Sequence, residues 1–291
     1  MDSGNVSKDE NIEIKRNELN VNLENIKSNH ILSRIYKNIN EKKLLQLVKY
    51  NKKIQNRLNL GTKNYKEYCE IEIEIVPIED KYGQFININE DNKMYYHIYL
   101  NDNKEEIKNK YSINKGDKVQ KIKIIIDYQV QSFEKLFICC RCIKTINFKK
   151  FNRNNIINMN GMFWGCESLK ELNMTNFNTA NVTNMREMFF EVSSLKEIKL
   201  SNFNTKEVTD MSFMFSGCSS LNKLNVSNFN TNKVIDMSCM FSRCSSLNEL
   251  DISNFNTSQV NDMSCMFYRC SNDLKNKIIS ENKNIKNEAF Y

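Results

Sequence analysis

The 291-residue sequence lacks any apolar run near the about 18 to 20 residues that a helix needs to cross a bilayer. Residues 1–16 are polar and charged, without the apolar segment of a secretory signal peptide. Residue 2 is not the glycine that N-myristoylation requires. These absences predict a cytoplasmic protein with no membrane span, and display at the cell surface or secretion is the alternative.

The sequence also has little of what catalysis commonly uses. It contains no Gly-rich phosphate loop, no H-E-x-x-H and no G-x-S-x-G, and its two histidines, His30 and His97, have no evident nucleophile partner. We therefore expect a protein that is not an enzyme and carries no catalytic residue, cofactor or metal.

Positive charge is not concentrated anywhere in the chain. The net charge is +7, from 42 Lys and Arg against 35 Asp and Glu, and residues 133–270 carry 15 basic and 12 acidic side chains. Nucleic-acid-binding proteins usually gather their positive charge on one face or stripe. The distribution argues against nucleic acid and favours a protein partner.

What the sequence does have is a repeat of 26 residues between Phe133 and Cys270. Columns of residues return at this step without an insertion: Phe151, Phe177, Phe203, Phe229 and Phe255; Met159, Met185, Met211, Met237 and Met263; Phe137, Phe163, Phe189, Phe215, Phe241 and Phe267; Cys140, Cys166, Val192, Cys218, Cys244 and Cys270; Ile143, Leu169, Leu195, Leu221 and Leu247. Self-similarity at a fixed period is the signature of a repeat architecture.

One repeat, Leu221–Ser246, shows the local chemistry. Leu224 and Val226 alternate with polar residues, as in a short strand with one buried face, and the turn-favouring run S-N-F-N-T follows. A single repeat cannot bury its own apolar face, whereas stacked neighbours can. We therefore expect an α+β protein with a leucine-rich-repeat-type solenoid and a parallel β-sheet.

The rest of the chain divides by composition and period. Helical spacing precedes Gly61, and a period of two begins at Ile71. The expected organisation is a disordered tail (1–22), a helical segment (23–62), a small β-rich module (63–130), the solenoid (131–270) and a C-terminal capping helix (271–291). We expect a monomer.

The repeat L-x-x-L-x-[VIL]-S-N-F-N-T-x-x-V-x-[DN]-M-x-x-M-F resembles the BspA-like leucine-rich repeats of bacterial and protist surface proteins. The resemblance covers about half the chain and implies a solenoid used for adhesion or protein binding. Secreted members begin with a signal peptide, which this chain does not show.

Residues 26–60 look like a degenerate F-box, although the usual Leu-Pro at the start of the motif and the Trp at its end are missing. An F-box binds the Skp adaptor of a ubiquitin ligase, while downstream repeats hold a substrate. The resemblance implies adaptor-binding positions at Ile31, Leu32, Ile35, Leu44 and Leu45. An ordinary helical cap on the β module is the other interpretation.

Protein binding is expected at strand positions that face away from the core, since equivalent positions of stacked repeats form one broad surface. These are Glu171, Asn173, Glu197, Lys199, Lys223, Asn225, Glu249 and Asp251. Their mixed charge favours a polar protein partner.

The ten cysteines suggest a disulfide or metal hypothesis, but five of them occupy a repeat column that also holds Val192. Valine replaces a small buried residue well and a metal ligand poorly. Cys139 and Cys142 form a C-x-x-C without a second pair at zinc-site spacing. We therefore predict free, buried thiols at Cys218, Cys244 and Cys270.

Overall fold

A computed structural model describes residues 26–29, 31–32, 45, 48 and 51–291 of the chain. It has two compact bodies, Met1–Cys69 and Glu70–Tyr291. In the first body, the described helices are α4 (Lys52–Arg57) and α5 (Thr62–Cys69), so helical structure continues into residues 62–69. The expected tail, residues 1–22, lies outside the described residues. No helix in the described ranges has the length and apolar character that a membrane crossing requires.

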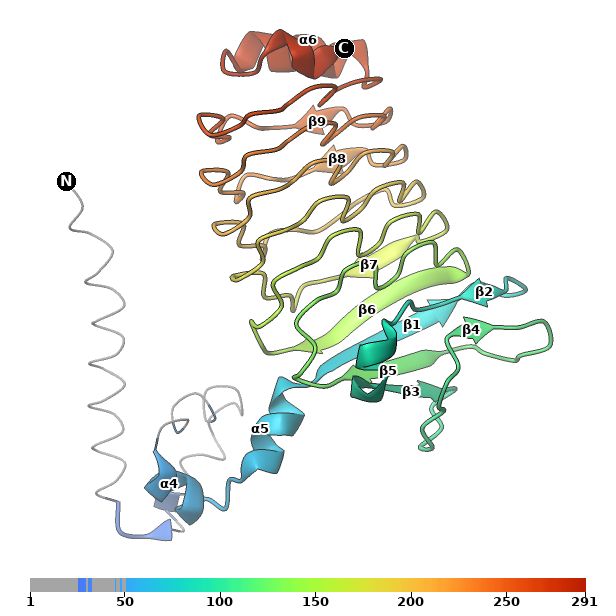
Figure 1. The fold of residues 1–291 in the computed structure, drawn as a ribbon, viewed down its shortest axis with the longest axis vertical. Helices are drawn as coiled ribbons and strands as arrows, with labels where there is room; N and C mark the ends of the chain where they lie inside the picture. Colours follow the sequence, from blue (N-terminus) through green and yellow to red (C-terminus); the bar gives the residue numbers. More distant parts are fainter. Residues whose placement is uncertain (1–25, 30, 33–44, 46–47, 49–50) are drawn as a thin grey trace. The chain divides into compact units, whose positions relative to one another are not determined.

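The second body begins with a five-stranded sheet (Figure 1), in the order β3 (Tyr96–Leu100), β5 (Ile122–Ile126), β1 (Ile71–Pro77), β6 (Ile143–Phe151) and β7 (Glu171–Asn173). The first four strands pair antiparallel, and only β6 and β7 are parallel. Ile71, Ile73 and Ile75 are fully buried, since alternate residues of a strand point to opposite faces. The intervening glutamates are partly exposed, and Glu72 and Glu74 pair with lysines of β5 and its flank.

Shorter elements complete the region before the repeats. Strands β2 (Gly83–Gln84) and β4 (Ser112–Ile113) form a separate antiparallel pair, and the 3-10 helix η1 (Glu90–Tyr95) leads into β3. Phe85 and Ile86, which follow β2, are buried without forming a strand.

The prediction of a leucine-rich-repeat solenoid with a parallel β-sheet is wrong. The main sheet is mixed and mostly antiparallel, and beyond β7 the leucine positions form only the two-residue strands β8 (Lys223–Leu224) and β9 (Glu249–Leu250). Both strands are followed by an Asn or Asp side chain that starts a turn. Asn225 Oδ1, for example, accepts a hydrogen bond from Ser227 N at 3.0 Å, which starts a turn.

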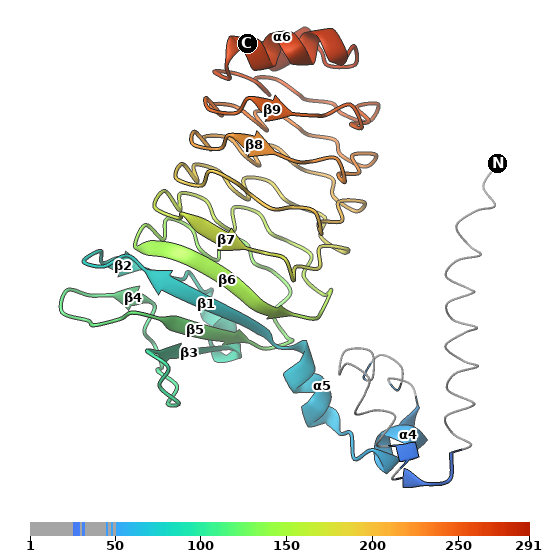
Figure 2. The same cartoon turned by 180° about the vertical axis from the view of Figure 1, so that it is seen from behind.

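Successive 26-residue repeats nevertheless lie side by side in sequence order (Figures 1 and 2). On the side away from the leucine positions, they are joined by isolated parallel bridges that run through Ser132, Asn158, Asn184, Asp210, Asp236 and Asp262. The most regular backbone pairing is therefore at the Asn/Asp positions that precede each methionine.

The core is continuous from Ile71 of the sheet to Ala289 near the C-terminus. Phe137, Phe163, Phe189, Phe215, Phe241 and Phe267 stack in one row, with neighbouring ring centroids 5.4–5.7 Å apart. Such offset-stacked pairs add to the stabilisation from burying the rings. The first repeat and the preceding sheet thus share one core.

Helix α6 (Asn272–Glu281) and the 3-10 helix η2 (Asn287–Phe290) close the last repeat. Leu274 and Ile278 of α6 are buried, and the N-cap Ser271 accepts a hydrogen bond from Leu274 N. Phe290 stacks on Phe267 at 5.5 Å, which continues the row of phenylalanine rings.

Candidate functional site

The eight predicted binding residues form a surface that we call the strand face. All eight are exposed: Glu171, Asn173, Glu197, Lys199, Lys223, Asn225, Glu249 and Asp251. They alternate with inward-facing apolar residues, of which Ile198, Leu224 and Leu250 are at most 3 % exposed. The strand face is therefore polar and overlies the hydrophobic core.

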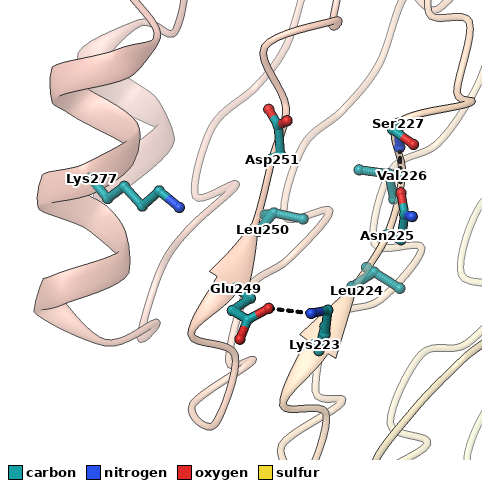
Figure 3. A pocket seen from close by; sticks show the side chains of 9 residues that line it. All are labelled: Lys223, Leu224, Asn225, Val226, Ser227, Glu249, Leu250, Asp251 and Lys277. Carbon is teal, nitrogen blue, oxygen red and sulfur yellow. Dashed lines mark hydrogen bonds and ion pairs between the residues drawn. The ribbon is translucent and has the colours of Figure 1, made fainter.

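The strand face contains two grooves. The distal groove, of about 440 Å³, lies over β8 and β9 (Figure 3). Helix α6 contributes Lys277, whose side chain extends toward the strand that carries Asp251. The complete lining is Lys223, Leu224, Asn225, Val226, Ser227, Glu249, Leu250, Asp251 and Lys277.

Charges in the distal groove are balanced within it. Lys223 Nζ lies 2.5 Å from Glu249 Oε2, and this hydrogen bond, with the positive charge of the lysine, lowers the pKa of Glu249. The backbone N–H and hydroxyl of Ser253 lower the pKa of Asp251, with a smaller contribution from Lys277. Two carboxylates therefore stay ionised beside two lysines.

The proximal groove is larger, about 960 Å³, and lies over β6, β7 and the following repeat. It includes the other four predicted residues, Glu171, Asn173, Glu197 and Lys199. The remaining lining residues are Glu74, Thr145, Ile146, Asn147, Lys170, Leu172, Thr175, Ser194, Lys196 and Ser220. The two grooves together thus contain all eight residues of the strand face.

The backbone ladder under the strand face is interrupted at the proximal groove. Lys170 N donates to Lys144 O and Asn222 N donates to Lys196 O, but within the described part of the chain no backbone bond joins Lys196 to Lys170. Residues 171–173 pair with β6, and Glu197 pairs with Lys223. The two sides of the groove therefore pair with different strands: residues 171–173 with β6, and Glu197 with the repeat that carries Lys223.

Leu172 is partly exposed beside this interruption. Its equivalents in the other repeats, Ile146, Ile198, Leu224 and Leu250, are at most 3 % exposed. Apolar surface is thus accessible to solvent at this position of the strand face, where the other repeats have almost none.

The N-terminal candidate positions are not gathered on one exposed surface. Leu32 and Leu45 are 0 % and 2 % exposed, whereas Ile31 is 53 % exposed. Leu32 packs in a small cluster with Val48 and Ile54. Ile35 and Leu44 lie outside the described residues.

The cysteine column consists of free, buried thiols, as predicted. The Sγ atoms of Cys218, Cys244 and Cys270 each lie 3.1 Å from a phenylalanine carbonyl oxygen of the preceding repeat. Of the C-x-x-C pair, Cys139 is exposed and Cys142 is buried near the carbonyl oxygens of residues 83 and 84. No cluster of three or more metal-ligating side chains occurs in the described ranges.

Several groove residues were missed by the sequence argument. Lys277 belongs to the C-terminal helix and Glu74 to the first strand of the sheet, so no repeat register connects them with the strand face. Lys170 and Lys196 do follow the 26-residue step, as does the exposed Lys144 before them. The return of a lysine at this step was the sequence signal that could have predicted these basic residues.

A family model described as "Mycoplasma protein of unknown function, DUF285" matches residues 131–223 and 189–289. The two matches overlap and together span residues 131–289, more than half of the 291-residue chain. The chain belongs to this family. The matched region holds the repeats, helix α6, all of η2 except its last residue, and every residue of the distal groove.

The other comparisons add no relative. Neither a search of the curated proteins nor a search of the solved structures found a match to the chain. The DUF285 description names no activity, ligand or partner. Function must therefore be argued from the strand face and its grooves.

Proposed function

We propose that this DUF285 chain is a non-enzymatic protein-binding protein and that the strand face is its binding surface. The observation that carries the proposal is the convergence of all eight outward-facing residues on two grooves of one surface. Concave sites with a few convergent polar groups are the usual places of ligand binding.

The chemistry of the strand face favours a folded or extended polypeptide as the ligand. Lysine, carboxylate and amide side chains alternate along it, and they offer both donors and acceptors. A membrane surface or a polyanion would favour one sign of charge instead. A polar protein surface satisfies both signs.

Two versions of the proposed binding role differ in cellular location. The resemblance of the repeats to BspA-like surface proteins favours an adhesin that binds proteins outside the cell. A cytoplasmic protein-interaction scaffold is the alternative proposal. Protease treatment of intact cells distinguishes them, because only a surface-displayed protein is digested before lysis.

The binding role is tested with a variant that rearranges charge without changing net charge. It carries Glu171→Lys, Glu197→Lys, Lys199→Glu and Lys223→Glu. A matched control carries Glu79→Lys, Glu105→Lys, Lys104→Glu and Lys115→Glu, at exposed positions of the region before the repeats.

We expect chemical cross-linking in the native cells to recover a specific protein with wild type and the control. The strand-face variant should lose it, because like charges would then face each other across the interface. Equal recovery by all three proteins would mean that binding does not use the strand face.

A further inference from the structure

The proximal groove holds more charged side chains without an ion pair than the distal groove does. Lys170, Lys196 and Lys199 are exposed, and in the described part of the chain none of them forms an ion pair within 4 Å. Glu74, the third acid of this groove, is already paired with Lys121 at 3.0 Å and with Lys149 at 3.6 Å. Among the described residues of this groove, the groups without an ion pair are therefore three lysines and two glutamates, Glu171 and Glu197.

The lysines form two separated positions. Lys170 and Lys196 line the groove and occupy equivalent positions in neighbouring repeats, 26 residues apart. Lys199 stands where the neighbouring repeats have Asn173 and Asn225. Glu171 and Glu197 lie between these positions in the sequence and would repel a continuous polyanion.

Lys199 also changes the local turn. In the neighbouring repeats, Asn173 Oδ1 accepts from Thr175 N at 3.1 Å and Asn225 Oδ1 accepts from Ser227 N at 3.0 Å. A lysine side chain has no acceptor and cannot make this bond. The substitution thus removes a structural contact and places a cation at the rim of the groove.

An apolar contact lies between the two cationic positions. Leu172 is the partly exposed member of an otherwise buried column, and it lines the same groove. Burying an exposed leucine side chain against an apolar ligand group is favourable because both leave water.

We propose that the proximal groove binds a short extended polypeptide segment in which two acidic side chains flank an apolar one. This inference rests on the proposed function and specifies its partner. In an extended chain, side chains at i, i+2 and i+4 point the same way, so an acid–apolar–acid pattern at this spacing presents all three groups to the groove.

The dimensions agree with this pattern. Lys196 and Lys199 are three residues apart, at most about 10 Å along the chain. The outer acids of the ligand would be about 13 Å apart, a difference that flexible lysine stems can span. The carboxylates would pair with Lys170 or Lys196 on one side and with Lys199 on the other, and the apolar side chain would contact Leu172.

The test uses the full chain and fluorescein-labelled nonapeptides of sequence GSESLSESG. Comparison peptides replace both acids by Gln, replace both by Lys, or replace the Leu by Ser. Fluorescence anisotropy measures binding at about 50 mM and about 500 mM salt, because screening weakens exposed ion pairs. We expect the acidic peptide to bind about tenfold more tightly than the Gln and Lys peptides, with a smaller loss for the Ser peptide and weaker binding at high salt.

Two variants with the same change in net charge separate the groove from general electrostatics. One carries Lys170→Glu, Lys196→Glu and Lys199→Glu, and the control carries Lys104→Glu, Lys115→Glu and Lys118→Glu at exposed sites before the repeats. We expect only the first to lose the tenfold preference. Circular dichroism verifies that both variants are folded.

Equal binding of all four peptides, or equal losses in the two variants, would overturn the inference. Single-stranded DNA that binds more tightly than the acidic peptide and displaces it would also overturn it, since the groove would then be a polyanion site. If the acidic peptide does not bind while cross-linking still recovers a partner through the strand face, only the inference of an acidic segment is wrong. If both fail, the proposed function is wrong as well.

Discussion

Thr205 and Asn230, in neighbouring repeats, exchange two hydrogen bonds through one hydroxyl group. Thr205 Oγ1 donates to Asn230 O at 3.0 Å and accepts from Asn230 N at 2.7 Å. Thr179 and Asn204, and Thr231 and Asn256, repeat this arrangement. The three threonines are 1 % exposed, so their hydroxyls replace water for backbone groups between the repeats.

Replacing Thr205 by Val should therefore lower the free energy of unfolding by about 1–3 kcal/mol, because both backbone groups of Asn230 would be left without a partner. Thr205→Ser keeps the hydroxyl and is the matched control. Urea denaturation measures the difference. If the Val and Ser variants are equally stable, the hydroxyl is not what joins these repeats.

The cysteine column predicts losses of stability of very different size for two substitutions of Cys244. Cys244→Val should cost less than about 1.5 kcal/mol, because Val192 already occupies an equivalent buried site. Cys244→Asp should prevent folding or destabilise severely, since an unpaired charge would be buried. Thermal melting distinguishes them, and a large loss in the Val variant would show that the Sγ contact to Phe215 O matters more than packing.

The burial of the cysteine thiols also predicts that the stability of the fold depends on pH. It raises the pKa of Cys218 from 9.0 to about 12 and that of Cys270 to about 11. Between pH 9 and these values, the unfolded chain loses thiol protons that the folded chain keeps, so stability is present below pH 9 and falls as the pH rises.

The Cys218→Val variant should lose less stability than wild type between about pH 8.5 and pH 11, because one such thiol is absent. Urea denaturation at several pH values measures the slopes, and other titrating groups are common to both proteins. Parallel slopes would contradict the assignment of a raised pKa to Cys218.

Removal of residues 274–291 should cause aggregation. The deletion takes away Leu274 and Ile278, and the ring of Phe290 that covers Phe267. It also removes Ala289, whose carbonyl accepts from Phe267 N at 2.6 Å. Stacked repeats need a polar cap for solubility. Sedimentation velocity measures the outcome, and a monomer with an unchanged melting curve would show that these residues are not the cap.

The 26-residue register predicted the core well. Columns read from the sequence, such as Phe163, Phe189 and Phe215, are the rows of stacked rings in the structure. The exposure of the strand-face residues followed from the same period, since positions between buried leucines must face solvent. Local periodicity therefore contains the information that decides burial.

The sheet could not be predicted in the same way. Periodicity identifies a strand but not its partner, and β1 pairs antiparallel with both β5 and β6 across long sequence separations. The buried threonine bonds were also missed, because a Thr in a turn-favouring run suggests local bonding rather than a bond to the next repeat.

Backbone conformation was a further limit. Glu191 and Arg243 have φ of 57° and 60° in the column that holds Gly217 at 77°. A left-handed residue is easily predicted at glycine, but non-glycine residues give no such signal. A Cβ on Gly217 would lie 3.2 Å from the Cα of Glu191, a close contact to which the neighbouring repeat would have to adjust.

The central claim is that the strand face binds a protein, and site-specific photo-cross-linking tests it most directly. A benzoylphenylalanine introduced at Glu171 or Glu197 should cross-link to the same partner, at the proximal groove. The control position is Ile235, which is 49 % exposed and lies outside both grooves. Cross-links at the two strand-face positions and none at residue 235 are the predicted result. Cross-links at residue 235 alone would contradict the account.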